Sequence, residues 1–204
     1  MVEPVRKQML LRPPVAPNMG HVPHIVHGFN WPDRFVVGTV GEPGSRTFYL
    51  QARTGSEMVS VALEKEQSAA LAQSIDKLLD ELMAGEDNPF SIPAQMPEGL
   101  IDNDGLDQPV TEEFRVGTMS LGWDPSTAQI VIEAAPIQED DPEDPEPLEP
   151  DAEEVLVVRI PVGAARAFAK RTREVVGAGR PFCPLCRLPM DPEGHVCDLT
   201  DGFA

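Results

Sequence analysis

The sequence has few cysteines, few basic residues and no long apolar run, and each shortage excludes a class of protein. Three cysteines cannot build a disulfide framework, because at least one thiol would stay unpaired. Sixteen Lys and Arg against 34 Asp and Glu give a net charge of −18, which disfavours DNA, RNA or an anionic membrane as the main partner. No apolar run is long enough to span a bilayer, and the first residues lack the apolar segment of a secretory signal. We therefore expect a cytoplasmic protein with reduced thiols and no membrane partner.

Proline, in contrast, is plentiful, with 22 residues, many of which are concentrated in three stretches. Residues 1–28 are interpreted as a flexible Pro-rich N-terminal arm, and residues 86–111 as a loop or linker. Residues 138–152 alternate Asp and Glu with proline. Like charges repel and proline cannot donate to a β-ladder, so this stretch is predicted to be a disordered acidic insertion.

Between these stretches the apolar pattern repeats. Residues 34–40, 47–53 and 58–63 are short and β-branched, which predicts three strands, and residues 64–83 carry an apolar stripe typical of a helix. Residues 114–119, 129–134 and 155–160 are again strand-like, and a second helical stripe follows Pro161. Both halves contain Val-Gly-Thr in the first strand, at 37–39 and 116–118.

The order of these elements predicts an α+β protein. A tandem β-β-β-α repeat, with units at 29–85 and 112–178, would form one or two antiparallel sheets with two helices packed on one side. The acidic insertion would interrupt the second unit.

The last 26 residues, 179–204, contain every cysteine. Cys183 and Cys186 are two residues apart, and His195 and Cys197 follow after a short Pro- and Gly-containing loop. This Cys3His spacing is typical of tetrahedral zinc, so we predict a C-terminal zinc knuckle. Because all four ligands come from the protein, the Zn²⁺ would be structural and not catalytic. A redox C-x-x-C pair and a disulfide are the alternatives.

Three segments carry a resemblance to a known family. They are residues 33–44, which read DRFVVGTVGEPG, residues 59–67, which read VSVALEKEQ, and the cysteine-containing segment from Arg180 to Cys197. Together they resemble an actinobacterial family of uncharacterised proteins, the domain of unknown function family 3090, over roughly residues 28 to 197. The resemblance implies an actinobacterial cytosolic protein and no particular activity.

The residues favour a non-enzymatic binding or adaptor protein with a protein partner. There is no G-x-S-x-G and no H-E-x-x-H, and the cysteines are assigned to metal, so no catalytic residue is predicted. The alternative is a hydrolase of phosphorylated or anionic small molecules. It would use an arginine and a carboxylate from the first unit, drawn from Arg34, Arg46, Arg53, Glu64 and Glu66.

Two weaker hypotheses involve other ligands. Single-stranded nucleic acid could bind the basic C-terminal segment together with Trp31 or Trp123. The stretch Asp102-Asn103-Asp104-Gly105, with Asp107 beyond it, is similar to the start of a calcium loop. The distal glutamate that such a loop requires is missing, so calcium is disfavoured.

Overall fold

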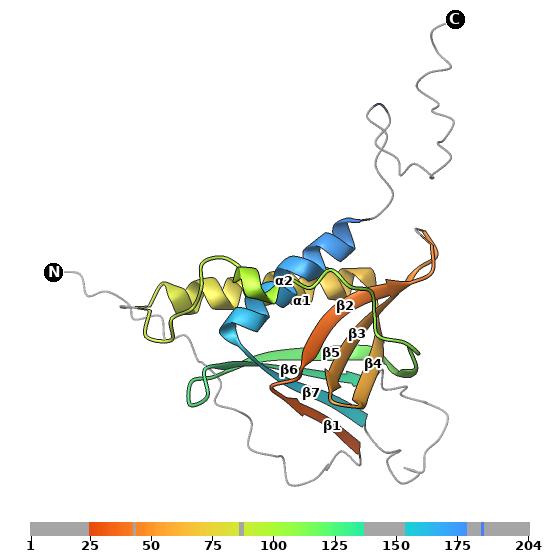
Figure 1. The fold of residues 1–204 in the computed structure, drawn as a ribbon, viewed down its shortest axis with the longest axis horizontal. Helices are drawn as coiled ribbons and strands as arrows, with labels where there is room; N and C mark the ends of the chain where they lie inside the picture. The colour runs from red at the N-terminus through yellow and green to blue at the C-terminus, as the bar shows by residue number, and fades with distance from the viewer. Residues whose placement is uncertain (1–24, 43, 86–87, 137–153, 179–184, 186–204) are drawn as a thin grey trace, which may run out of the picture.

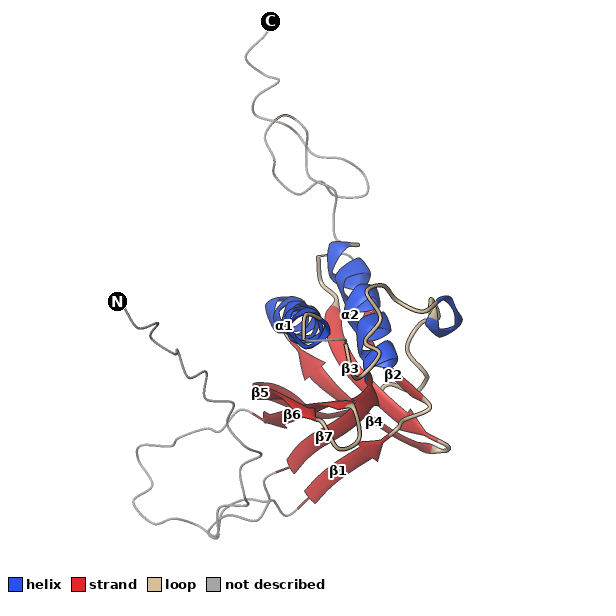
Figure 2. Cartoon of the chain, turned by 90° about the vertical axis from the view of Figure 1, so that its left-hand side faces the viewer, coloured by secondary structure: helices blue, strands red, loops and turns tan. Residues whose placement is uncertain are grey.

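The computed structural model describes residues 25–42, 44–85, 88–136, 154–178 and Leu185. Within these ranges the chain forms a seven-stranded sheet and two helices, α1 (Lys65–Met83) and α2 (Val162–Gly177), which confirms the α+β class. Both helices lie on one face of the sheet, as expected (Figures 1 and 2). The strands are β1 (Ile25–Asn30), β2 (Arg34–Val40), β3 (Thr47–Thr54), β4 (Glu57–Leu63), β5 (Glu112–Asp124), β6 (Gln129–Pro136) and β7 (Glu154–Pro161).

The sheet is mixed, whereas the sequence led us to expect antiparallel pairing. Its strand order is β1-β7-β6-β5-β4-β3-β2. The hairpin neighbours are antiparallel, but β4 pairs with β5 in parallel and β1 pairs with β7 in parallel. The connection from β4 to β5 passes through α1 and a long loop, so the chain returns to the same end of the sheet and must run in the same direction. The two halves thus share one sheet.

Strand β1 begins at Ile25, inside the stretch interpreted as a flexible arm. Its residues include Ile25, Val26 and Phe29, which favour an extended strand, and none of its residues is charged. The strand was not predicted because the residues before it are rich in proline, and because its partner β7 lies far along the chain, where a local pattern cannot reveal it.

The core lies between the helices and the sheet. The apolar stripe predicted for the first helix is buried at Leu71, Ile75 and Leu79. The second helix buries Phe168, whose ring stacks on Phe35 of β2 at 4.5 Å between centroids and 12° between planes. Helix α1 begins after Glu64, whose backbone N–H donates to the Gln67 side chain at 2.8 Å and so satisfies a group at the helix start.

Residues 96–107, which we call the strap, begin beside α2, where Pro97 and Leu100 face Gly163, and end on the opposite face of β2 and β3. Leu106 is buried against Gly38 of β2, where an added Cβ would lie 2.5 Å from Leu106 Cγ. The buried amide of Gln51 donates to Ser60 Oγ at 3.0 Å and to the Asp107 carbonyl at 3.1 Å, and it accepts from Asp107 N–H at 2.8 Å. Strands β2 and β3 are therefore packed on both faces at these contacts, and this part of the predicted linker is a packed element.

Among the described residues, no helix is long and apolar enough to cross a membrane.

Candidate functional site

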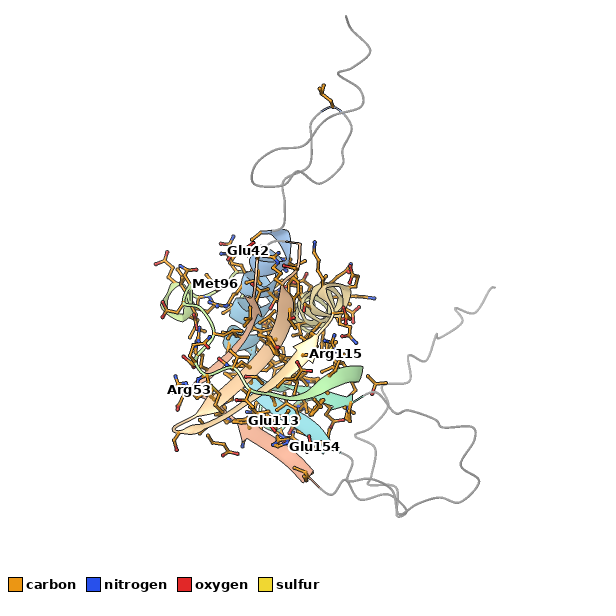
Figure 3. The ribbon with its side chains drawn as sticks, turned by 90° about the vertical axis from the view of Figure 1, so that its right-hand side faces the viewer. Glu42, Arg53, Met96, Glu113, Arg115 and Glu154 are labelled. Atoms are coloured by element: carbon orange, nitrogen blue, oxygen red, sulfur yellow. The ribbon has the colours of Figure 1, made fainter. Side chains whose placement is uncertain are left out.

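A groove of about 400 Å³ opens between α2, the first residues of β2 and the strap. Figure 3 shows Met96 and Arg53 on the side of the molecule along which the strap runs. The size falls within the range of ordinary ligand pockets, which are lined mainly by apolar side chains. The apolar residues lining it include Trp31, Phe35, Met96, Leu100, Ile101 and Phe168, and we call it the Trp31 groove.

The rim of the Trp31 groove is exposed and apolar. Trp31 is 56% exposed, Leu100 44% and Ile101 54%. Large apolar side chains gathered at one place on a surface are a common mark of an interaction site. The stacked pair of Phe35 and Phe168 lines the groove beneath them. The surface offered to a ligand is therefore mainly hydrophobic.

Trp31 is held in an unusual backbone conformation. Its φ is 58°, in the left-handed region that bulky residues rarely adopt. Its N–H donates to the Arg159 carbonyl at 3.0 Å, which fixes the turn between β1 and β2. Strained backbone of this kind is concentrated at functional sites, because the surrounding structure must hold it in place.

The lining of the groove includes an ionic cluster centred on Asp102. Its carboxylate accepts hydrogen bonds from Arg34 of β2 at 2.7 and 3.0 Å, and from Arg171 of α2 at 2.7 Å. Arg34 also donates to the carbonyls of Asp104 and Gly105 at 3.0 and 2.8 Å. A strand and a helix thus grip the same part of the strap, and they fix that wall of the groove.

The cluster keeps its members charged. The hydrogen bond from Arg34 holds the pKa of Asp102 below its ordinary value against the opposing effect of burial, and the nearby Arg171 adds to the lowering. The same hydrogen bond raises the pKa of Arg34. Burial lowers the pKa of Arg171, and the charge of Asp102 opposes this. Because these charges already have partners, they are poorly placed to hold a charged ligand.

The residues considered for a hydrolase do not form one site. Arg34 and Arg53 are brought together as paired residues of β2 and β3, and Asp107 lies 3.2 Å from the first and 2.9 Å from the second. Arg46 donates to carbonyls at the end of α2 at 3.2 and 3.3 Å and lies over the Phe48 ring. The carboxylates are elsewhere, at the start of α1.

The two carboxylates of that hypothesis occupy structural positions. Glu64 precedes the first residue of α1 and accepts a hydrogen bond from Arg115 of β5 at 2.6 Å. Glu66 is exposed in the first turn, where the helix dipole favours an anion. Neither lines the Trp31 groove.

The aspartates that were considered for calcium bind arginine instead. Asp102 and Asp107 accept from guanidinium groups, while Asp104 offers its backbone carbonyl to Arg34. Within the described ranges, no group of His, Cys, Asp or Glu is arranged to hold a metal ion. The predicted zinc ligands lie outside those ranges, as does the acidic insertion of residues 138–152; the ligands are Cys183, Cys186, His195 and Cys197.

The two tryptophans have different surroundings. Trp31 lies at the groove, whereas Trp123 packs edge-to-face with Phe90 at 4.9 Å between ring centroids. Sequence reasoning named Trp31 only for nucleic acid and missed the part played by Leu100, Ile101 and Arg171. The available signal was the presence of large apolar residues in a stretch otherwise rich in proline and aspartate.

These features define an α+β protein with one mixed sheet, two helices on one face and an apolar groove beside edge strand β2. Residues 27–197 match the family described as "Protein of unknown function (DUF3090)", so the chain belongs to this family. The expected family is therefore confirmed. Neither the curated proteins nor the solved structures contain a match to the chain.

Proposed function

We propose that this protein is a non-enzymatic binding or adaptor protein, and that the Trp31 groove receives an apolar side chain of a protein partner. The observation that carries the proposal is the contrast within the groove. Its exposed rim is formed by Trp31, Leu100 and Ile101, while its buried charges are already paired with one another. Removing such apolar surface from water is the main source of affinity in protein association.

The same contrast supports the hydrolase hypothesis less than the binding hypothesis. An anionic substrate would have to take Arg34 and Arg171 away from Asp102, and an unpaired, partly buried carboxylate is costly. The carboxylate suggested by the sequence would not serve as acid or base there, because Glu64 does not line the groove and is paired with Arg115.

Nucleic-acid binding through the basic helix also has less support. Arg166 pairs with Asp76 and Asp80 of α1 at 2.9 and 2.8 Å. Arg173 contacts Asp76 as well, and Lys170 pairs with Glu174 at 2.6 Å. The basic side chains of α2 therefore have carboxylate partners, which weakens their attraction for phosphate.

The structural zinc remains part of the proposal. Cys183, Cys186, His195 and Cys197 would bind one Zn²⁺ in residues 179–204, which follow directly after α2. The zinc knuckle would serve as a second docking element in addition to the Trp31 groove. We also propose that the protein is actinobacterial and cytoplasmic and that it arose by duplication of a β-β-β-α unit. The motifs support the first part; for the second, β2-β3-β4-α1 and β5-β6-β7-α2 follow the same order, with β1 as an additional strand.

Selection from a random-peptide phage library tests the groove. The full zinc-loaded chain is the bait, and the selected peptides are measured by isothermal titration against three proteins: the unchanged chain, Trp31→Ala and Val40→Ala. We expect peptides with an aromatic or branched apolar residue at a fixed position. Loss of Trp31 should weaken them at least about tenfold, as for a central interface residue.

Val40→Ala is the matched control, because Val40 is 45% exposed at the far end of β2 and does not line the groove. It should leave the affinity unchanged. The proposal is wrong if no peptide with an apolar anchor is enriched, or if the selected peptides bind Trp31→Ala as tightly as the unchanged chain.

A further inference from the structure

A second hollow lies on the sheet, with a volume of about 790 Å³, and it shares no lining residue with the Trp31 groove. It is formed by β1, β5, β6 and β7 together with the start of α1, and we call it the Val26 pocket. Val155 and Val157 of β7 line it and alternate with the buried Leu156. Because neighbouring residues of a strand point to opposite faces, the pocket lies on the face of these strands that is turned away from the core.

The floor of the Val26 pocket is apolar. Val26 of β1 pairs in register with Val155 of β7, and Val26 is 54% exposed. Ala135, Pro136 and Val157 continue the apolar lining on β6 and β7. Covering such a surface with further apolar side chains is favourable, because it removes both surfaces from water.

The rim of the Val26 pocket is acidic. Glu133 of β6 is exposed and accepts a hydrogen bond from Ser120 at 3.0 Å, and Glu154 is the first residue of β7. Glu64 also lines the pocket, but it is paired with Arg115 of β5 at 2.6 Å. Figure 3 shows Arg115 and Glu154 on the same side of the molecule. Within the described ranges, Glu133 and Glu154 form no ion pair, so the pocket has carboxylates to offer to a cation.

The chain attaches further negative charge beside the pocket. Strand β6 ends at Pro136 and β7 begins at Glu154, and both of these residues line the pocket. The stretch that joins them, residues 137–153, contains nine Asp and Glu and no Lys or Arg. Since this stretch is attached to the pocket at both ends, its charge adds to that of the rim. The occupant that suits the pocket therefore carries positive charge together with apolar side chains.

One segment of the chain has this composition. Residues 5–12 read VRKQMLLR, with three basic residues, no acidic residue and no proline, although the whole chain has a net charge of −18; we call them the basic segment. The segment precedes β1, and Val26 is the second residue of that strand. The residues between them, 13–24, can span roughly 40 Å when extended, which is enough to return to the pocket.

We propose that the basic segment binds the Val26 pocket of its own chain. Its Met-Leu-Leu run covers the apolar floor, and its basic residues pair with Glu133 and Glu154. A short link keeps the segment near the pocket at an effective concentration in the millimolar range, so a contact that would be weak between separate molecules is populated. The acidic stretch of residues 137–153 is a poor occupant, because it would be repelled by the same two carboxylates.

Carbodiimide cross-linking of the full chain, followed by mass spectrometry of its peptides, tests the contact. Lys7 is the lysine of the basic segment, and we expect it to form an amide bond with Glu133 or Glu154. In an equal mixture of ¹⁴N-labelled and ¹⁵N-labelled chains, these cross-linked peptides should carry a single label. Mixed labels would identify a second copy as the donor of the segment and overturn the inference. It is also overturned if Lys7 is joined only to residues 137–153, or to neither pocket glutamate.

A pair of double variants tests the apolar part of the contact. Leu10→Ser with Leu11→Ser keeps Lys7 in place, and it should lower the yield of the cross-link at least about threefold, because the apolar contact is lost. Val15→Ser with Val22→Ser is the matched control, since it changes two apolar residues outside the basic segment, and it should leave the yield unchanged. Equal yields from the two double variants overturn the inference.

Discussion

At the scale of single residues, Asp102 matters most for the shape of the Trp31 groove. Arg34 and Arg171 are 11% and 12% exposed in their side chains, and Asp102 is 29% exposed. Two nearly buried guanidinium groups therefore share this carboxylate, and Arg34 has Asp107 as a second carboxylate at 3.2 Å. Their shared partner ties the strap to β2 and α2 at the same point.

We expect Asp102→Asn to lower the free energy of unfolding by about 2 kcal/mol, because the amide cannot neutralise two arginines. Urea unfolding followed by circular dichroism measures this change. Glu81→Gln serves as the control, since Glu81 forms only an exposed i,i+4 pair with Lys77 at 4.0 Å and should cost less than about 0.5 kcal/mol. Equal effects of the two variants would contradict the assigned role of Asp102.

The pKa of Asp102 predicts a pH dependence of stability. Its folded pKa lies below the ordinary value of 3.8, so in acid the unfolded chain binds the proton more readily. The contribution of Asp102 is therefore complete above about pH 4, and it is lost as pH falls through the folded pKa. The urea midpoints of the unchanged chain and of Asp102→Asn should therefore converge as the pH falls below about 4. A difference between the two midpoints that stays constant with pH would contradict the account.

At the scale of elements, the strap decides how the sheet is buried. Its Leu106 and Asp107 contact the face of β2 and β3 that the helices leave open, and the fit depends on the absence of a side chain at position 38. Leu106 occupies the space that any other residue there would need. Strap and sheet are thus complementary in shape as well as in hydrogen bonding.

Gly38→Ala should destabilise the protein by roughly 1–3 kcal/mol, because the new Cβ would lie 2.5 Å from Leu106 Cγ. In Gly38→Ala with Leu106→Ala the overlap is removed. The combined loss in free energy of unfolding should then be smaller than the sum of the two single losses. Additive losses in a double-mutant cycle would show that the two positions do not interact.

The sequence predicted most elements because their signals are local. The stripe that includes Leu71 and Ile75 predicts a helix from its spacing alone, and alternation did the same for β4. The parallel pairings of β4 with β5 and of β1 with β7 depend on partners far along the chain, which spacing does not encode. For the same reason, the residues at which strands begin and end were better predicted than the pairing of the strands.

The groove was hidden for a related physical reason. Arg34 and Asp102 are 68 residues apart, and Arg171 is a further 69 away, so no motif joins them. The Asp-rich stretch that suggested calcium was instead a set of arginine partners. Apolar residues in the predicted linker were the one available indication that it packs against something.

At the scale of the whole molecule, the account has two parts: a sheet-and-helix body with a groove, and a C-terminal zinc knuckle. The knuckle is a prediction from sequence, since its ligands lie outside the described residues. The body contains none of the four ligands, so the two parts should respond separately to loss of metal.

We expect the reduced, purified chain to contain one zinc ion, measured by inductively coupled plasma mass spectrometry. Cys183→Ser should abolish stoichiometric zinc, because a structural site needs its full ligand set. His27→Gln removes an imidazole outside the motif and should leave the zinc content unchanged. Reduced protein without metal, or full zinc in Cys183→Ser, would contradict the prediction.

The most direct test of the binding proposal uses the two tryptophans of the chain as reporters. In a ¹H–¹⁵N correlation spectrum, titration with a selected apolar-anchor peptide should shift the indole N–H signal of Trp31 in proportion to binding. The signal of Trp123, which packs against Phe90, should stay in place. Saturating peptide that moves the Trp123 signal alone, or neither signal, would contradict recognition at the Trp31 groove.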